Sequence, residues 1–230
     1  MNTEQFYKRG YNILEEVFSL QEVDSLTQLI GHAGSSRPTF RKTDDLFAIR
    51  QFLKEVPQIQ AAVFNTNLRT LIRDHFGADY FVVKSIYFDK PETSNWFVAW
   101  HQDLTISVDK KLDCPGFSNW TTKHDQFAVQ PPLPLLEKML TIRIHLDDTD
   151  EHNGALRVIP GSHQKGIYRH TPGDAETTCR VRKGGVMLMR PLLQHASNRT
   201  TNASRRRVIH IEFSNMSLPA GLEWAEKMGK

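Results

Sequence analysis

The sequence predicts a mainly β protein of α+β class, a jelly roll with helices in front of it. Two observations support this prediction. From Tyr80 onward, short stretches rich in β-branched and aromatic residues alternate with turns that contain glycine or proline. Before Tyr80, the apolar residues recur at helical spacing instead. Many short strands after a helical opening are typical of a jelly roll backed by helices.

Three helices are expected in the first third of the chain. Ser19 and Glu22 form a capping-box pattern, and the helix that they begin ends at Gly31. A second helix is expected over residues 44–56, where apolar residues share one face until a proline stops it. A third helix follows and ends at Gly77.

The clearest of the expected strands covers residues 139–147. Four aliphatic residues occupy one of its faces, whereas Thr141, Arg143 and His145 occupy the other. This alternation predicts a strand with one face in the core and one polar face. The other expected strands cover residues 80–88, 95–108, 155–159, 178–182, 186–189 and 206–213.

Residues 109–137 are expected to form a long irregular connection, because they contain several prolines and no clear alternation. A connection of that length is usually functional, so we interpret it as a lid-like loop. The sequence thus predicts one domain of 230 residues. It would comprise helical support over residues 1–78, a jelly-roll core over 79–214 and a C-terminal tail over 215–230.

The composition is typical of a soluble globular protein, since 39% of the residues are hydrophobic and 24% are charged. No apolar run reaches the roughly 18 residues that span a membrane, and the first residues do not resemble a secretory signal. Cys114 and Cys179 are more consistent with free thiols in a reducing compartment than with a disulfide framework. We therefore expect a cytoplasmic protein without a membrane partner, either a monomer or a homodimer.

The formal net charge of +3 is small, and its one basic cluster is the three arginines at 205–207. A cluster this short is more simply interpreted as a solvated strand end than as a nucleic-acid site. No nucleic-acid partner is expected.

His101 and Asp103 form the first candidate site. They lie in the expected strand 95–108, and residues two apart in a strand point to the same face. The imidazole and the carboxylate should therefore lie side by side, with Trp100 and Gln102 turned away. Such a pair makes two-thirds of a 2-His-1-carboxylate triad, the open-sided site of non-haem Fe(II) oxygenases. Alone it is a weak signal, because chance His-x-Asp pairs are common.

His195 is the best candidate for a third ligand. It follows the expected strand 186–189, and strands of a barrel can pair in space when they are distant in sequence. The other histidines compete less well, two as packed strand residues and two as turn or loop residues: His145, His210, His163 and His124.

Arg206 is the candidate anchor for a co-substrate. An oxygenase of this kind needs electrons, usually from a 2-oxo acid whose far carboxylate binds a bidentate guanidinium. Arg206 shares strand parity with His210 and Glu212, so this polar face and the His101 face plausibly line one cavity. From the residues alone, the alternative that Arg206 is simply one of three exposed arginines stays open.

Together these residues resemble the phytanoyl-CoA dioxygenase family of Fe(II)/2-oxoglutarate oxygenases. The similarity extends from about Lys84 to Phe213, and its middle motif, with a Pro-Gly turn, is the most specific. The three motifs are Trp100-His101-Gln102-Asp103, the stretch from Asn153 to His163, and His195-Ala196-Ser197 followed by Arg206.

The resemblance implies a double-stranded β-helix and hydroxylation of a small organic substrate by O₂, with release of succinate and CO₂. Ser197 matches a family position that helps to bind the carboxylate of 2-oxoglutarate beside Arg206, and Lys84 matches one that faces the active site. The Fe(II) ligands implied by the family are His101, Asp103 and His195.

Other functions remain open. One is a cupin-like metal-binding barrel that is non-oxidative or non-catalytic. A cupin enzyme would need a third His or a Glu near His101, which we do not find, and binding alone would not require Arg206 as well. A nucleic-acid demethylase is disfavoured by the small charge and by the lack of an aromatic-basic stripe.

The substrate is expected to be small, with an anionic group such as a carboxylate. That group would be met by Arg143, next to Thr141 on its strand face, or by Lys84. The alternative is that Arg143 pairs with a carboxylate such as Asp147. Within the lid-like loop, two further side chains could cover the substrate: Trp120 and His124.

Overall fold

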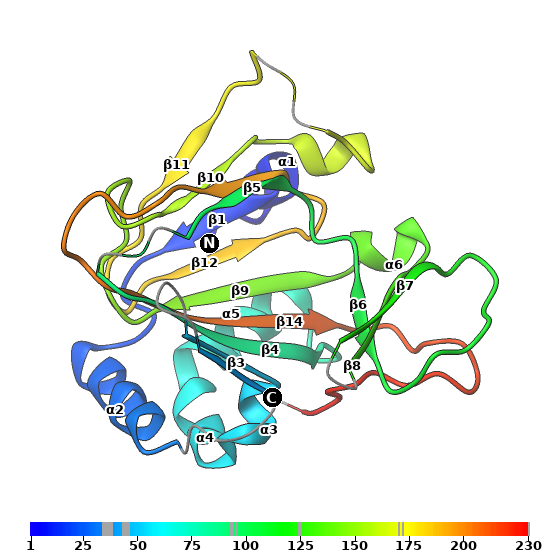
Figure 1. The fold of residues 1–230 in the computed structure, drawn as a ribbon, viewed down its shortest axis with the longest axis horizontal. Coiled ribbons are helices and arrows are strands. Elements are labelled where there is room, and N and C mark those ends of the chain that lie inside the picture. Colours follow the sequence, from blue (N-terminus) through cyan, green and yellow to red (C-terminus); the bar gives the residue numbers. More distant parts are fainter. Residues whose placement is uncertain are drawn as a thin grey trace.

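The computed structural model describes residues 1–33, 39–42, 47–92, 94, 96–123, 126–169, 171 and 173–229. Two sheets face each other and form the predicted jelly roll (Figure 1). Their strands pair antiparallel throughout. The larger sheet has seven strands, in the order β1 (Tyr11–Leu14), β12 (Val186–Met189), β9 (Leu140–His145), β14 (Arg206–Ser214), β4 (Phe81–Lys90), β3 (Phe47–Arg50) and β2 (Phe40–Lys42).

The smaller sheet lies over one face of the larger one. Its four strands run in the order β11 (Thr177–Cys179), β10 (Leu156–Val158), β13 (His195–Ser197) and β5 (Val98–His101). Under β11 and β10 the space is filled by apolar side chains such as Val158, Met187 and Met189. Under β13 and β5 it is polar and holds a cavity.

All the helices except the last, Leu133–Glu137, contribute to the core on the opposite face of the larger sheet (Figure 1). The capping box that begins α2 is confirmed: Ser19 Oγ accepts from the Glu22 N–H at 3.2 Å, and Glu22 Oε2 accepts from the Ser19 N–H at 2.8 Å. The helices are α1 (Thr3–Arg9), α2 (Leu20–Gly31), α3 (Phe52–Glu55), α4 (Gln60–Val63), α5 (Thr66–Phe76) and α6 (Leu133–Glu137), with 3-10 turns at Pro57–Ile59 and Ser162–Lys165.

Strand β14 shows how this arrangement divides a single strand between core and cavity. Ile209 and Ile211 are fully buried against the helices, and each such side chain contributes about 1.5–3 kcal/mol of hydrophobic stabilisation. His210 and Glu212, which alternate with these isoleucines, line the cavity on the other face. The alternation predicted for 206–213 is therefore correct, and it fixes which residues reach the site.

The expected helix over residues 44–56 is wrong over residues 47–50, and only residues 52–55 of its described part are helical. Residues 47–50 form β3, which pairs with β4, with Ala48 opposite Phe88. Gln51 then adopts a left-handed conformation (φ 51°) that separates this strand from the short helix α3. Pairing with the edge of β4 outweighs the helical spacing of the apolar residues. Strands β1, β2 and β3 also show that residues 1–78 supply part of the sheet as well as helical support.

The expected third helix is divided in two. Asn65 ends the first part by capping α5, since its side chain accepts from the Leu68 N–H at 2.8 Å. An Asn at this position satisfies a backbone donor that a continuous helix would have bonded internally.

Residues 109–137 are not an irregular loop. They contribute β7 (Ser118–Lys123), β8 (Gln126–Gln130) and α6, and with β6 (Ile106–Val108) the two strands form a third sheet, in the order β6–β8–β7 (Figure 1). The segment after residue 214 joins the barrel through bridges from Met228 to Val82 and from Trp224 to Val108. Among the described residues, no helix has both the length and the apolar character needed to cross a bilayer.

Candidate active site

The candidate site lies in a cavity of about 280 Å³ between the two sheets. The smaller sheet contributes His101, His195 and Ser197, and the larger sheet contributes Arg143 and Arg206. Residues from strands far apart in the sequence therefore meet in one space, as the strand parities predict.

His101 and His195 are brought together by strand pairing. They lie directly opposite each other in β5 and β13, and their ring centroids are 4.1 Å apart. Asp103 lies two residues beyond the last residue of β5 and still points to the same side. Its carboxylate oxygens lie 3.9 Å from His101 Nε2 and 3.8 Å from His195 Nε2. The expected strand thus ends at His101, although the expected proximity is present.

Backbone contacts orient both imidazoles. The Nδ1 atom of His101 lies 2.8 Å from the Ala99 carbonyl oxygen, and that of His195 lies 2.9 Å from the Leu193 carbonyl oxygen. Since a carbonyl can only accept, each Nδ1 carries the proton and donates. Each Nε2 then presents a lone pair toward Asp103, which is the tautomer that a metal ligand requires.

The protonation states also suit a metal ion. Burial alone raises the pKa of Asp103, but the neighbouring His195, His210, Lys84 and His101 together lower it to about 2. Burial lowers the pKa of His195 to about 4. At neutral pH the carboxylate is therefore ionised and the His195 imidazole is neutral. One buried Asp103 oxygen, Oδ2, has no hydrogen-bond donor in the described structure, which leaves it available to a cation.

A second group of possible ligands lies deeper in the cavity. Asp103, His210 and Glu212 also approach one another closely enough to hold an ion. However, Lys84 Nζ lies 2.7 Å from Glu212 Oε1, and His210 Nε2 lies 3.2 Å from the same oxygen. An ammonium already occupies this position, so the group formed by His101, Asp103 and His195 fits a metal better.

Arg206 presents an unpaired guanidinium to the cavity. Its side chain is buried, and neither Nε nor Nη1 has an acceptor among the described residues. Burial, with the charge of Arg143, lowers the pKa of Arg206 to about 9, so the group remains charged at neutral pH. A buried charge without a partner is costly, and a bound carboxylate would compensate it. Ser197 lines the same cavity.

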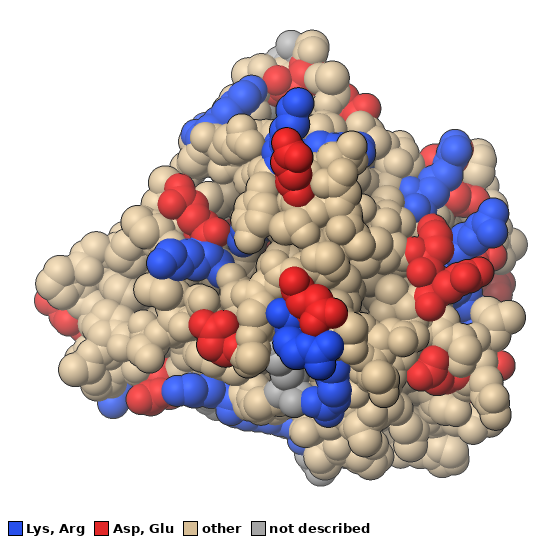
Figure 2. Space-filling view, turned by 180° about the vertical axis from the view of Figure 1, so that it is seen from behind, with Lys and Arg blue, Asp and Glu red and all other residues tan. Residues whose placement is uncertain are grey.

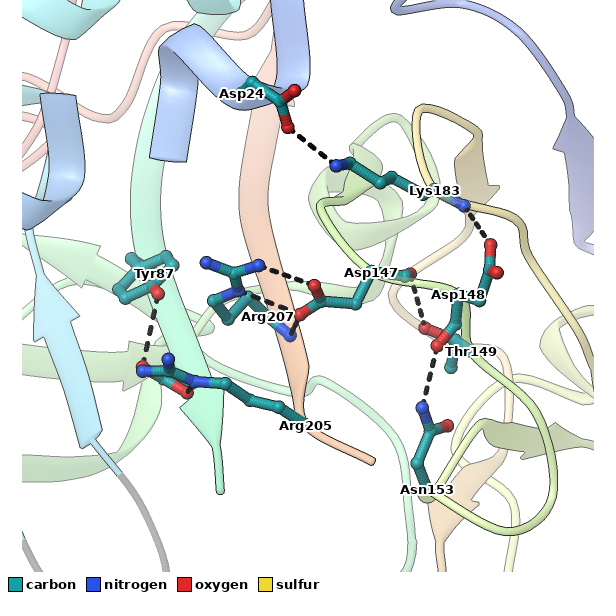
Figure 3. Close-up of polar contacts among 10 residues, drawn as sticks. Asp24, Tyr87, Asp147, Asp148, Thr149, Asn153, Lys183, Arg205 and Arg207 are labelled. Atoms are coloured by element: carbon teal, nitrogen blue, oxygen red, sulfur yellow. Dashed lines mark hydrogen bonds and ion pairs between the residues drawn. The ribbon is translucent and has the colours of Figure 1, made fainter. Parts of the chain in front are cut away.

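The neighbouring arginines have carboxylate partners elsewhere (Figure 3). Arg205 forms a bidentate pair with Asp89. Arg207 donates from Nε and Nη2 to Asp147 at 2.9 and 2.6 Å. Neither lines the cavity, so Arg206 differs from them in both direction and pairing. The alternative partner considered for Arg143, Asp147, is bound to Arg207 instead.

Four of the cavity residues form a polar row. Arg143 Nη1 lies 3.1 Å from His210 Nδ1, and Glu212 links His210 to Lys84. The strand parity with Arg206 predicted that His210 and Glu212 face the cavity, and both line it. The sequence assigned neither of them a role there, because the contacts with Arg143 and Lys84 depend on neighbouring strands.

Two of the remaining substrate candidates, Thr141 and Trp120, do not line the cavity. Thr141 is fully buried on β9 and is not among the residues that line the cavity. Trp120, on β7, packs against an apolar cluster that contains Val83 and Ile106. His124 lies outside the described residues.

Comparison with known proteins identifies the family. The family model of phytanoyl-CoA dioxygenase (PhyH) matches residues 6–208 of this chain. The chain belongs to the phytanoyl-CoA dioxygenase family. The family match begins within α1, so it includes the helices whose resemblance is less distinct in the sequence.

Two curated relatives are dioxygenases. Ectoine dioxygenase of Sphingopyxis alaskensis is 23% identical over 167 residues, covering 69% of this chain and 48% of the relative. A probable alpha-ketoglutarate-dependent hypophosphite dioxygenase of Stutzerimonas stutzeri is 25% identical over 181 residues, covering 72% and 54%. The chain spans about half the length of these relatives.

Among solved structures, the non-haem alpha-ketoglutarate-dependent carbocyclase SnoK from nogalamycin biosynthesis shares the fold. The TM-score is 0.69 at 17% identity, over 92% of this chain and 81% of SnoK.

Proposed function

We propose that this protein is an Fe(II)- and 2-oxoglutarate-dependent dioxygenase that hydroxylates a small organic molecule. One observation carries the proposal: two oriented imidazoles, an ionised carboxylate and an unpaired guanidinium line a single cavity. A metal-binding barrel without oxidative chemistry would account for His101, Asp103 and His195. It would not account for Arg206, whose buried charge needs an anion. Family membership supports the same reaction class.

The residues divide between the metal and the co-substrate. His101, Asp103 and His195 would hold the iron, and Arg206 with Ser197 would hold the far carboxylate of 2-oxoglutarate. Bound iron with its 2-oxo acid supplies the oxidising power. The reaction balances when one atom of O₂ enters a substrate C–H bond and the other enters succinate. The substrate and 2-oxoglutarate each provide two electrons, and CO₂ leaves.

The protein's own contribution is orientation and charge. The Nδ1–H donors to Ala99 and Leu193 keep both Nε2 lone pairs aimed at one point. Because His195 is neutral and Asp103 is ionised at pH 7, neither must lose a proton when a cation binds. A guanidinium on a rigid strand fixes the co-substrate with two parallel hydrogen bonds, which a flexible ammonium cannot do.

Thermal-shift titration with Mn(II) and 2-oxoglutarate tests the proposal. We expect each addition to raise the melting temperature, and the two together to raise it most, since ligands that bind only the folded state stabilise it. A metal-binding barrel would respond to Mn(II) but not to 2-oxoglutarate. Succinate formation with Fe(II) and O₂ then tests turnover. Absence of any 2-oxoglutarate effect in the presence of Mn(II) would contradict the proposal.

A further inference from the structure

A second cavity adjoins the candidate active site. It has a volume of about 210 Å³ and lies between β4 and the three-stranded sheet. Arg50, Lys84 and Ile86 line both cavities, so the two meet at these side chains. Its far wall carries side chains that can donate or accept hydrogen bonds, beside Phe127 and Ala128: Thr105, Ser107, Thr121 and Gln126.

Most charged groups around the two cavities have partners. Lys84 is paired with Glu212, and Arg143 contacts His210. Glu226, in the second cavity, accepts from the Ser85 N–H at 2.6 Å through Oε2, and its other oxygen meets the Ser85 hydroxyl. The ion pair with Glu212 compensates the charge of Lys84, whereas Arg143, which lies away from the junction, keeps a buried Nε without an acceptor among the described residues.

Arg50 is the exception at the junction. It lies at the end of β3 and is half-buried. Its guanidinium makes no hydrogen bond or ion pair with any other described residue. Burial and the positive charge of Arg41 both lower the pKa of Arg50, so its surroundings add positive charge rather than compensate it. Arg50 is thus the arginine at the junction of the two cavities that lacks an anionic partner among the described residues. The other arginines, Arg41, Arg143 and Arg206, line only the active-site cavity.

We infer that the primary substrate is a small hydrophilic organic anion, held at the junction by a carboxylate or phosphate group on Arg50. Planar bidentate binding of such oxyanions is the characteristic role of Arg. The hydroxyl and amide groups of β6, β7 and β8 would bind the polar remainder of the molecule. This inference rests on the proposed function, in which Arg206 is occupied by 2-oxoglutarate. The sequence predicted that Arg143 or Lys84 binds the anionic group, whereas the structure favours Arg50.

The test compares charged and neutral probes on the protein loaded with Mn(II) and 2-oxoglutarate. The probes are glucuronate with glucuronamide, shikimate with its primary amide, and glucose 6-phosphate with glucose. We expect at least one anion to stabilise the complex at a concentration at least tenfold lower than its neutral partner. The carboxylate and phosphate pairs separate the two oxyanion classes.

Variants of Arg50 test whether this residue causes the preference for the anion. Arg50→Gln should abolish the preference for the anion, and Arg50→Lys should restore it in part, because the charge returns without the bidentate geometry. The control is Arg73→Gln, since Arg73 is exposed on α5 and pairs only with its neighbour Asp74. It should keep the wild-type preference. Far-ultraviolet circular dichroism checks that each variant is folded.

Three results would overturn the inference while leaving the proposed function intact. Neutral probes could bind as tightly as their anions, Arg50→Gln could keep the preference, or no anion could bind although Mn(II) and 2-oxoglutarate stabilise the protein. If 2-oxoglutarate itself fails to stabilise the Mn(II)-loaded protein, the proposed function fails and the inference falls with it.

Discussion

Three consecutive arginines at the start of β14, residues 205–207, differ because each has a different environment. Arg205 and Arg207 bind carboxylates (Figure 3), whereas Arg206 is buried without one. We expect Arg206→Lys to raise the KM for 2-oxoglutarate about 30- to 100-fold, because losing one charge-assisted hydrogen bond of a bidentate pair costs about 2–3 kcal/mol. Steady-state assays of succinate formation measure this. Arg205→Lys and Arg207→Lys are the matched controls, and a larger effect at either would contradict the assignment.

Asp103 is the only carboxylate in the better of the two metal-ligand groups. We expect Asp103→Ala to weaken Mn(II) binding at least 100-fold, because the anionic ligand is lost and two neutral imidazoles remain. Titration of free Mn(II) by electron paramagnetic resonance gives the affinity. Asp113→Ala, at an exposed aspartate, should bind Mn(II) as the wild type does. Tight Mn(II) binding by Asp103→Ala would contradict the assignment of Asp103 as a metal ligand.

Glu226 makes stability depend on pH. Burial raises its pKa from 4.5 to about 7. Between these values the folded protein holds a proton that the unfolded chain has lost, so stability falls as the pH rises through 7. We expect the loss between pH 4.5 and 8 to be about 2–3 kcal/mol, and to disappear in Glu226→Gln. Urea unfolding at both pH values measures it. Glu223→Gln, at an exposed neighbour, should keep the wild-type dependence, and an unchanged slope in Glu226→Gln would exclude this origin.

At the scale of elements, two glutamines beside the proposed metal ligands bind one segment of backbone. Gln102 Nε2 donates to the Gly166 carbonyl at 2.8 Å, and Gln102 Oε1 accepts from the Tyr168 N–H at 2.8 Å. Gln194, next to His195, donates to the Tyr168 carbonyl. The segment between β10 and β11 therefore contacts both the residue after β5 and the residue before β13.

This contact predicts a positioning role for Gln102. We expect Gln102→Leu to weaken Mn(II) binding about tenfold, because outer contacts that orient metal ligands typically contribute 10- to 100-fold to affinity. The control is Gln164→Leu, since Gln164 is exposed and contacts only the carbonyls of Tyr7 and Lys8. Unaltered Mn(II) affinity in Gln102→Leu, with a lowered melting temperature, would show a purely structural role.

The elements that the sequence predicted well are those in which one face is buried. Strand β9 and strand β14 alternate between the helical core and the cavity, so their parity identified Arg143 and Arg206 as cavity residues. Strand β3 was not predicted, because it depends on pairing with β4, and such a long-range contact leaves no local pattern. The sheet formed by β6, β8 and β7 was missed for the same reason.

The same difference between local and long-range contacts applies to the residues of the candidate site. The two-residue spacing predicted that His101 lies beside Asp103, although β5 ends at His101, and the pairing of β13 with β5 places His195 opposite His101. Nothing local connects Arg50 with this cavity, because its position depends on an unpredicted strand. The hydrogen-bond row from Arg143 to Lys84 likewise requires three strands in register.

At the scale of the whole molecule, charge is mixed. Acidic and basic side chains are interspersed over most of the face shown in Figure 2, and the formal net charge is only +3. A broad field that steers anions over long distances would need a surface of one sign. The proposed selectivity for an anion would therefore depend on Arg50 and Arg206, because buried or partly buried charges are screened by salt far less than surface charges.

The cavity wall is divided between distant parts of the chain. The proposed metal and co-substrate residues lie between positions 101 and 206, whereas Arg50 lies on β3, near the start. Exchange of the segment that contains β2 and β3 between relatives could thus change the substrate while the proposed iron and 2-oxoglutarate site stays intact. Specificity could diverge in this way without an inactive evolutionary intermediate, and a chimera made at the same boundaries would reproduce that step in the laboratory.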